Sequence, residues 1–385
     1  MPKWLQSPLI CLLISALVFI IFIFGRLYQS RFDSSSFVVA GDRYCDPSRV
    51  PQSLTVLKNS AGFDGQFYYR LALNPFTRQQ TEFGITLDAP ALRHQRILYP
   101  LLSSMLSFGN RGLLPKVMLL LNFVALCLMG WVGGIYARAL NRPAIWGLVL
   151  PLYPGFLLTL SRDTVEIFEA TIVLGCLLLL RRGKPLLASV LLALAVLTKE
   201  TAVLVAVAAA PVYVVERKRQ RQNSPPLYFI AIPLLVFALW QFILFQNWGE
   251  FPIRASEGAN LGMPFAGVFA ALRASGFQRP FQLRKFSELI FLLAFGVAVL
   301  YLLRSGRSTS HEIASWVLVA LLSIVLGTSV WIEDWTFMRV LSLFYILGAT
   351  IIIGSERKVK YLVFGCSLSF WCLLFFKLMR SYALN

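Results

Sequence analysis

One carboxylate is placed where it could do chemistry. Asp64 is the single acid in AGFDGQFYYRLALNPF, residues 61–76, and it lies between Gly62 and Gly65. Beside aromatic side chains at a bilayer surface, a carboxylate is partly desolvated, which raises its pKa toward that of a general base. Asp is also a common N-cap, here for a helix running from Gly65 to Leu73. The pattern predicts either a catalytic base or a helix cap.

A second group of acids follows in SRDTVEIFEA, residues 161–170, with Asp163, Glu166 and Glu169 spaced by three. Asp163 and Glu166 fit a helix capping pair, and acids at a helix N-terminus are favoured by its dipole. Glu169 lies roughly 9 Å further along the helix, where an ionisable group usually faces a polar cavity.

Two further segments place charges beside apolar runs. Lys199 and Glu200 in LTKETA, residues 197–202, either pair with each other at the membrane interface or belong to a site. Arg339 follows Glu333 and Asp334 in WIEDWTFMR, residues 331–339. The tryptophans of that segment are typical of an aromatic belt at the membrane surface.

The densest basic group near Asp64 is Arg93, His94 and Arg96 in LRHQRILYP. Such a group either contacts anionic lipid headgroups or grips the phosphate of a lipid-borne substrate, which arginine binds with two parallel hydrogen bonds. The two functions overlap physically, because a lipid phosphate is also a headgroup.

Several chemistries have no signature in the sequence. It contains no G-x-x-x-x-G-K-[ST], G-x-G-x-x-G, H-E-x-x-H or G-x-S-x-G motif, so nucleotide-driven transport, zinc proteolysis and α/β-hydrolase chemistry are not indicated. Of six cysteines, only Cys45 lies outside an apolar run, so a disulfide framework is not expected. The net charge of +18 is explained by basic loops of a membrane protein, and we expect no nucleic-acid partner.

Composition indicates which elements must position these residues. The chain has 385 residues, of which 57% are hydrophobic and 14% charged, and this composition predicts an all-α polytopic transmembrane bundle. We expect about eleven spans, within a range of 10–13, the first of them a retained anchor. The predicted spans cover residues 8–25, 113–137, 143–160, 164–180, 185–199, 202–215, 226–246, 286–303, 312–331, 336–353 and 360–377.

The basic clusters predict the topology. Five short clusters of Arg and Lys follow or precede apolar runs, near residues 138–142, 181–184, 217–221, 304–307 and 357–360. Placing them in the cytoplasm by the positive-inside rule puts the N-terminus inside and residues 26–112 and 247–285 outside. The short stretch 97–109 is expected to lie at the membrane face rather than to cross. We therefore expect one transmembrane domain over 1–385, in the cell (inner) membrane, with all candidate acids on the extracytoplasmic side.

The order of these motifs resembles a known family. A first span, a long outer loop with FDGQFYYRLA and then HQRILYPLLS is similar to the multi-pass GT-C glycosyltransferases that use polyprenyl-phosphate-linked sugars. The likeness is strongest to bacterial cell-surface glycopolymer formation proteins, and more remote to the mannosyltransferase that adds the second mannose in GPI-anchor synthesis. The residues that carry it are Phe63, Asp64, Tyr68, Ala72, Tyr99, Pro100 and Leu101, with SRD and LTKET further on.

The resemblance implies a mechanism. Asp64 would activate an acceptor hydroxyl for inverting attack on a sugar carried by polyprenyl phosphate, whose phosphate would lie near Arg93 and Arg96. Asp163, Glu166 and Lys199 would line the acceptor side, where a glycan or lipid-linked acceptor binds. The remaining candidate binding residues are Tyr68, Tyr69, Arg70, His94 and Glu200.

Family members often carry a paired acid in the first loop, whereas Asp64 has no acidic neighbour. Asp42, Asp46 or Asp88 could supply the partner. No cofactor is therefore assigned, and a requirement for Mg²⁺ or Mn²⁺ stays open.

Two alternatives to an enzyme remain from the sequence. A transporter or flippase of lipid-linked sugars would depend on intramembrane charges such as Glu169. A non-catalytic subunit of an envelope assembly would depend on its surfaces and would tolerate the loss of Asp64.

Overall fold

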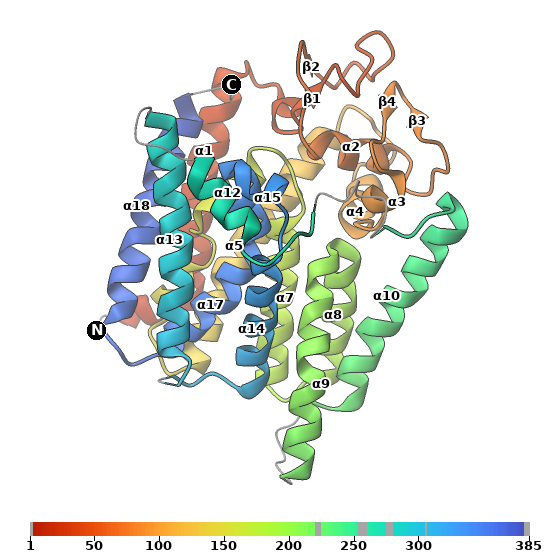
Figure 1. Ribbon diagram of the computed structural model, residues 1–385. Helices are drawn as coiled ribbons and strands as arrows, with labels where there is room; N and C mark the ends of the chain where they lie inside the picture. The colour runs from red at the N-terminus through yellow and green to blue at the C-terminus, as the bar shows by residue number, and fades with distance from the viewer. Residues whose placement is uncertain (1–2, 220–224, 253–259, 275–279, 305, 381–385) are drawn as a thin grey trace.

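The structure is a computed structural model that describes residues 3–219, 225–252, 260–274, 280–304 and 306–380. It is a bundle of α-helices, as the composition predicts, because only helices satisfy every backbone polar group of an apolar span internally. The longer helices are α1 (Pro8–Gln29), α5 (Leu114–Ala139), α7 (Glu166–Arg181), α8 (Pro185–Thr198), α9 (Val203–Lys218), α10 (Leu227–Trp248), α13 (Pro280–Leu302), α14 (Ser310–Ile324), α17 (Ser342–Gly354) and α18 (Val359–Arg380). In Figure 1, α8, α9 and α10 form one flank of the bundle, while α13 and α18 form the other.

Within the described residues, five helices are long and apolar enough to cross a membrane, namely α1, α5, α10, α13 and α18. Three shorter apolar helices, α8, α14 and α17, complete the apolar part of the bundle.

Three predicted spans are not single helices. Residues 143–160 divide into the 3-10 helix η3 (Ala144–Val149) and α6 (Pro154–Leu160), because the two prolines in PLYP lack a backbone N–H and disfavour helix in the residue before them. Residues 312–331 divide into α14 and α15 (Thr328–Ile332), and residues 336–353 divide into α16 (Asp334–Val340) and α17. The bundle therefore has broken helices at its centre, where the sequence predicted continuous ones.

The segment between α1 and α5 folds over one end of the bundle, at the top of Figure 1. It contains η2 (Ser34–Phe37), α2 (Gly65–Leu73), α3 (Pro90–His94) and α4 (Leu98–Leu106). The strand β1 (Ala40–Gly41) pairs in parallel with β2 (Val56–Leu57), and β3 (Thr81–Glu82) pairs antiparallel with β4 (Ile85–Thr86). At nine residues, α4 is roughly 14 Å long, about half the thickness of a bilayer's hydrocarbon core; that it lies at the membrane face stays a prediction.

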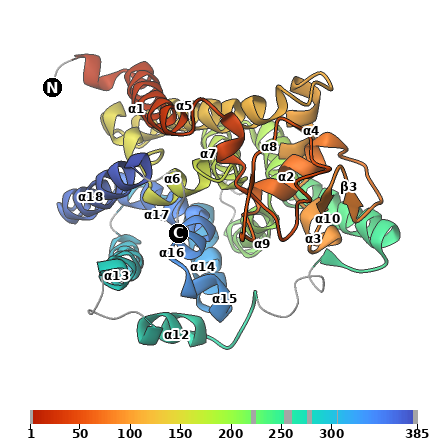
Figure 2. The same cartoon turned by 90° about the horizontal axis from the view of Figure 1, so that it is seen from above.

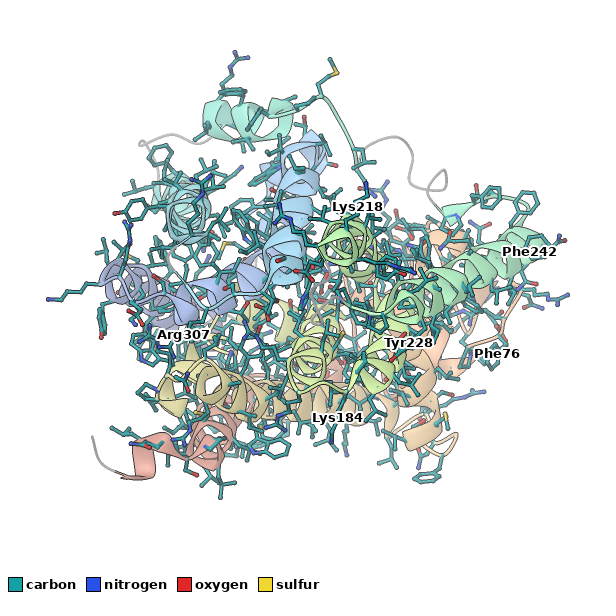
Figure 3. The ribbon with its side chains drawn as sticks, turned by 90° about the horizontal axis from the view of Figure 1, so that it is seen from below. Phe76, Lys184, Lys218, Tyr228, Phe242 and Arg307 are labelled. Carbon is teal, nitrogen blue, oxygen red and sulfur yellow. The ribbon has the colours of Figure 1, made fainter. Side chains whose placement is uncertain are left out.

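The basic clusters meet at the opposite end of the bundle. Arg142 donates to the Ser355 carbonyl at 2.9 Å, Arg181 donates to the Arg307 carbonyl at 2.8 Å, and Arg307 donates to the Leu140 carbonyl at 3.2 Å. Cations are favoured there because helices such as α5, α7 and α17 end with unpaired carbonyls. Figure 3 looks onto this end, with Lys184, Lys218 and Arg307 labelled.

The second predicted loop, 247–285, is described only in part, because residues 253–259 and 275–279 lie outside the described residues. Its described portion contains α12 (Ala266–Ala274), which packs on α15 at the edge of the bundle (Figure 2). Two further 3-10 helices, η1 (Lys3–Gln6) and η4 (Glu200–Ala202), begin the chain and connect α8 to α9.

Candidate active site

Asp64 occupies the N-cap position of α2 but does not cap it. Its side chain makes no capping hydrogen bond. Oδ1 instead accepts from Nη1 of Arg93 at 2.9 Å, and Oδ2 accepts from Nη2 of Arg339 at 2.8 Å. The interpretation of Asp64 as a helix cap is therefore wrong, and its carboxylate is held by two arginines.

These arginines also decide the charge of Asp64. Burial alone raises the pKa of a carboxyl, but the positive charges of Arg93, Arg339 and Arg96 outweigh it and hold the pKa of Asp64 well below its ordinary value. The expectation of a pKa raised by desolvation is thus wrong for this state. Asp64 is an ionised carboxylate at neutral pH.

The glycines on either side of Asp64 permit a close approach of backbones. A Cβ on Gly65 would lie 2.3 Å from the Arg162 carbonyl oxygen and 2.7 Å from that of Val38, so α2 can begin at this point only with glycine. Gly62 has a φ of +65°, which glycine adopts without steric cost. The Gln66 side chain accepts from the Gly41 N–H at 3.0 Å and donates to the Ala61 carbonyl at 2.8 Å, which fixes the loop before Asp64.

An aromatic and cationic stack joins this loop to a distant helix. The ring of Phe63 meets Trp335 edge-on, with 5.2 Å between centroids. The guanidinium of Arg162 lies 4.3 Å from the Phe63 ring centre and 5.1 Å from that of Trp335. Cation–π contacts of this kind are favourable, and the stack brings α16, and with it Arg339, up to Asp64.

The two arginines predicted to bind phosphate are both at this site. Arg93 donates to Asp64 and also to Asp88, from Nε at 2.8 Å and from Nη2 at 2.7 Å. Arg96 donates to both carboxylate oxygens of Glu200, at 3.0 and 2.7 Å, and to the Tyr68 hydroxyl at 2.9 Å. Burial raises the pKa of Glu200, but Arg96 outweighs it and lowers that pKa to about 2.

A buried lysine connects the site to α7. Lys199 Nζ lies 3.3 Å from Glu166 Oε1 and 3.9 Å from Glu169 Oε2. Glu169 also accepts from the Thr201 hydroxyl, and Arg339 Nε lies 3.7 Å from Glu166 Oε1. Lys199 and Glu200 are therefore not paired with each other, because each has a partner on another element.

Seven of these residues form a continuous chain of ion pairs, and the Arg96–Glu200 pair lies beside it. We call the whole set the Asp64 network. It contains four cations and five carboxylates from both halves of the chain. Its members are Asp64, Asp88, Arg93, Arg96, Glu166, Glu169, Lys199, Glu200 and Arg339, with the Tyr68 hydroxyl bound to Arg96. Buried charges persist only when they are paired or hydrogen-bonded, so this cluster is a prearranged polar site at one end of an apolar bundle.

Three of the predicted binding residues have other contacts. Arg70 is buried and donates to Glu82 at 2.6 Å and to Thr77 at 3.2 Å. The Tyr69 hydroxyl lies 3.2 Å from that of Ser53. His94 contacts the Pro90 carbonyl at 3.1 Å and the ring of Trp248, and burial lowers its pKa to about 4. The contacts of Arg70 and Tyr69 lie within the segment between α1 and α5, that of His94 also reaches α10, and none of them involves Asp64.

Asp163 lies behind the network in a separate triad. Oδ1 is 2.6 Å from the Tyr99 hydroxyl and accepts from the Asn122 amide at 2.8 Å, while Tyr99 is also 2.8 Å from the Met118 carbonyl. The single hydroxyl hydrogen of Tyr99 cannot serve both acceptors. Both contacts are satisfied when Asp163 is protonated and donates to Tyr99, in keeping with burial raising its pKa to about 7.

The triad also corrects the predicted capping pair. Helix α7 begins at Glu166 with Val165 at the N-cap position. Asp163 has a φ of +51° and lies before the helix. Asp163 and Glu166 therefore do not form a capping pair, since each bonds a different set of side chains.

The sequence did not predict Arg339 as part of the site. It lies 275 positions from Asp64 in a segment that reads as an aromatic belt. The local sequence around Arg339 indicates no more than a basic residue close to the outer end of a predicted span. Glu169, whose depth in the span did indicate a polar surrounding, joins the network through Lys199.

The donor set around Asp64 does not fit a divalent cation in this arrangement. Both of its oxygens are bound by arginine. Across the part of the chain that the structure describes, no group of three or more His, Cys, Asp and Glu side chains is placed to hold a metal ion. Of the three acids considered as partners, Asp88 reaches Asp64 through the shared Arg93.

Comparison with known proteins reveals a structural relative. No family model and no curated protein sequence matches the chain. The crystal structure of ArnT from Cupriavidus metallidurans bound to undecaprenyl phosphate does match, with a TM-score of 0.53 and 10% sequence identity. The match covers 87% of this chain and 59% of ArnT, so the chain spans less than two thirds of that protein's length.

Proposed function

We propose that this chain, which has the GT-C-type polytopic membrane fold, is a glycosyltransferase. It would move a sugar from polyprenyl phosphate to an acceptor hydroxyl. One observation carries the proposal. Asp64, the candidate base, lies within hydrogen-bond distance of two arginines at one end of a membrane bundle. A base beside phosphate-binding cations is what this transfer needs.

The proposed reaction is an inverting displacement at the anomeric carbon. Asp64 accepts the proton of the acceptor hydroxyl, whose oxygen attacks the anomeric carbon from the face opposite the phosphate. The bond between the anomeric carbon and the phosphate oxygen breaks, its electron pair stays on the phosphate, and the configuration inverts. Arginines then stabilise the charge on the leaving phosphate.

The location of the site supports an extracytoplasmic reaction. The basic clusters, of which Figure 3 labels Lys184, Lys218 and Arg307, gather at the end of the bundle opposite α2 (Figures 1 and 3), and basic loops favour the cytoplasmic side. We therefore propose a multi-pass protein of the cell (inner) membrane that contributes to surface glycan or glycopolymer synthesis. Glu169, on which the transporter alternative depended, is paired with Lys199 and Thr201.

The first prediction tests the base. We expect Asp64→Asn to reduce sugar transfer by at least about 100-fold, at unchanged amounts of folded protein, because an amide cannot accept the proton. Transfer is measured with the purified protein, a polyprenyl-phosphate sugar donor and an extract of cell-surface glycan acceptors.

Asp46→Asn is the matched control, since Asp46 is in the same loop and its side chain, among the described residues, contacts Ser48 and Arg49 rather than the network. Full activity of Asp64→Asn would refute the mechanism. Movement of lipid-linked sugar across vesicles without bond formation would instead identify a flippase.

A further inference from the structure

The arginines that hold Asp64 each have a second acidic neighbour. Arg93 is shared with Asp88 at 2.7 Å, and Arg339 is shared with Glu166 at 3.7 Å. The third arginine nearby, Arg96, is held by Glu200. None of the three would be left as an isolated buried charge if Asp64 became neutral.

Arg339 also has a donor to spare. Its Nη2 binds Asp64 and its Nε faces Glu166, but its buried Nη1 has no hydrogen-bond partner among the described residues. The residue is only 9% exposed, and an unsatisfied buried donor costs about 1–3 kcal/mol. An anionic oxygen of a ligand would satisfy it.

The charge of the Asp64 network limits what can bind there. Its five carboxyl groups face four cations, so the named members of the network hold no excess positive charge for a phosphate. A phosphate monoester carries up to two negative charges, its second pKa being about 6. Binding this product beside an ionised Asp64 would therefore be opposed by like charges.

The reaction itself removes the conflict. As the new glycosidic bond forms, a proton leaves the acceptor hydroxyl for Asp64, and the broken bond leaves its electron pair on the phosphate. Asp64 loses one negative charge and the phosphate gains one. The total charge of the site is unchanged, while the carboxylate that held Arg93 and Arg339 becomes neutral.

We propose that Arg93 and Arg339 pass from Asp64 to the lipid phosphate as Asp64 takes the proton, so that binding of the polyprenyl monophosphate product is coupled to proton uptake. This inference rests on the proposed function. It makes Arg339 a catalytic residue that touches the leaving group. The groups facing Asp64 are Arg93 from α3, Arg339 from α16, and Arg96 and Tyr68 beside them, while Glu166 from α7 faces Arg339.

Calorimetry can test the coupling without turnover. Undecaprenyl phosphate is titrated into the purified full-length protein at pH 7 in two buffers of different ionisation enthalpy, and the difference in heat gives the protons exchanged. We expect the wild type to take up about one proton more per lipid than Asp64→Asn does. Equal proton exchange in both would overturn the inference and leave the proposed function standing.

Two arginine variants complete the test. We expect Arg339→Gln to bind the lipid phosphate about 10- to 100-fold more weakly, and Arg339→Lys, which keeps the charge, to lose less. Arg49→Gln is the matched control, because Arg49 is exposed in the first loop and pairs with Asp46. Unchanged affinity in Arg339→Gln would overturn the role of Arg339, whereas failure of the wild type to bind the lipid would refute the proposed function itself.

Discussion

At the scale of single residues, the site is defined by how carboxylates are paired. Asp64 is ionised because two arginines hold it, whereas the side-chain partners of Asp163 in the described part of the chain are Tyr99 and Asn122, which carry no charge. The same side chain thus carries a charge in one place and a proton in the other, since only neighbouring cations offset the cost of burial.

The second prediction concerns Asp163. Its pKa is raised from 3.8 to about 7 in the folded protein, so the protonated form favours folding. The contribution to stability is present below about pH 4 and is lost as pH rises through about 7, at about 1.4 kcal/mol for each pKa unit.

We expect Asp163→Asn, whose amide can donate as the protonated acid does, to abolish this loss. Thermal unfolding of the purified protein at pH 5 and pH 8 measures it, with Asp46→Asn as control. An equal pH dependence in wild type and Asp163→Asn would contradict the assignment of a proton to Asp163.

At the scale of elements, the site depends on a close backbone crossing. Helix α2 begins against the carbonyls of Val38 and Arg162, and the Phe63, Arg162 and Trp335 stack fastens the same loop to α16. These contacts therefore fix the position of α2 relative to α16, so that Arg339 reaches Asp64.

The third prediction tests that crossing. In Gly65→Ala the new methyl group would meet backbone oxygens at 2.3 and 2.7 Å, so α2 must move and carry Asp64 away from Arg339. We expect a loss of transfer activity comparable to that of Asp64→Asn, with reduced thermal stability.

Gly365→Ala in α18 is the control, since a Cβ there has no neighbour within 4 Å. Activity and stability are measured on both variants side by side. Full activity of Gly65→Ala would show that the contact does not position Asp64.

At the scale of the whole molecule, the bundle separates two ends of different character. Helix α2, which follows Asp64, lies at one end (Figure 1), and the arginines that bind backbone carbonyls beyond the ends of helices such as α5 and α17 lie at the other. The apolar helices between them place a membrane there, because lipid accepts no unpaired backbone or charge.

The fourth prediction concerns the topology. Asn110 and Arg138 lie before the start and near the end of α5, which has 26 residues and is roughly 39 Å long. We expect Asn110→Cys to react with an impermeant thiol reagent from outside the cell, and Arg138→Cys only after the membrane is opened. A background without native cysteines is required because Cys366 is exposed. Labelling of both positions from one side would refute the topology.

The fifth prediction concerns metal ions. Because arginines occupy both oxygens of Asp64, we expect sugar transfer to continue at an unchanged rate in EDTA. Addition of Mg²⁺ or Mn²⁺ should not raise it. Loss of activity in EDTA and its recovery with either ion would show that the acids rearrange to bind a cation.

The sequence by itself determined the features that repeat locally along the chain. Apolar runs predicted a helical membrane bundle, and the segment after Asp64 predicted a helix from Gly65 to Leu73, which is α2. The GT-C-type fold was likewise expected from the order of motifs and is confirmed by the structural match. The sequence did not predict the breaks within three spans, because hydropathy is averaged over a window of residues. Such an average stays high across a short turn between two apolar helices.

Only the tertiary structure decided the partners of the charges. Nothing near Asp64 in sequence indicates Arg339, and nothing near Lys199 indicates that it binds Glu166 rather than Glu200. The sequence predicted a raised pKa for Asp64. Burial does raise it, but the fold brings Arg93 and Arg339 to the carboxylate, and their positive charges lower the pKa. Burial depends on local apolarity, which can be read along the chain, but the energy of a buried charge depends on which opposite charges the fold brings within a few ångströms.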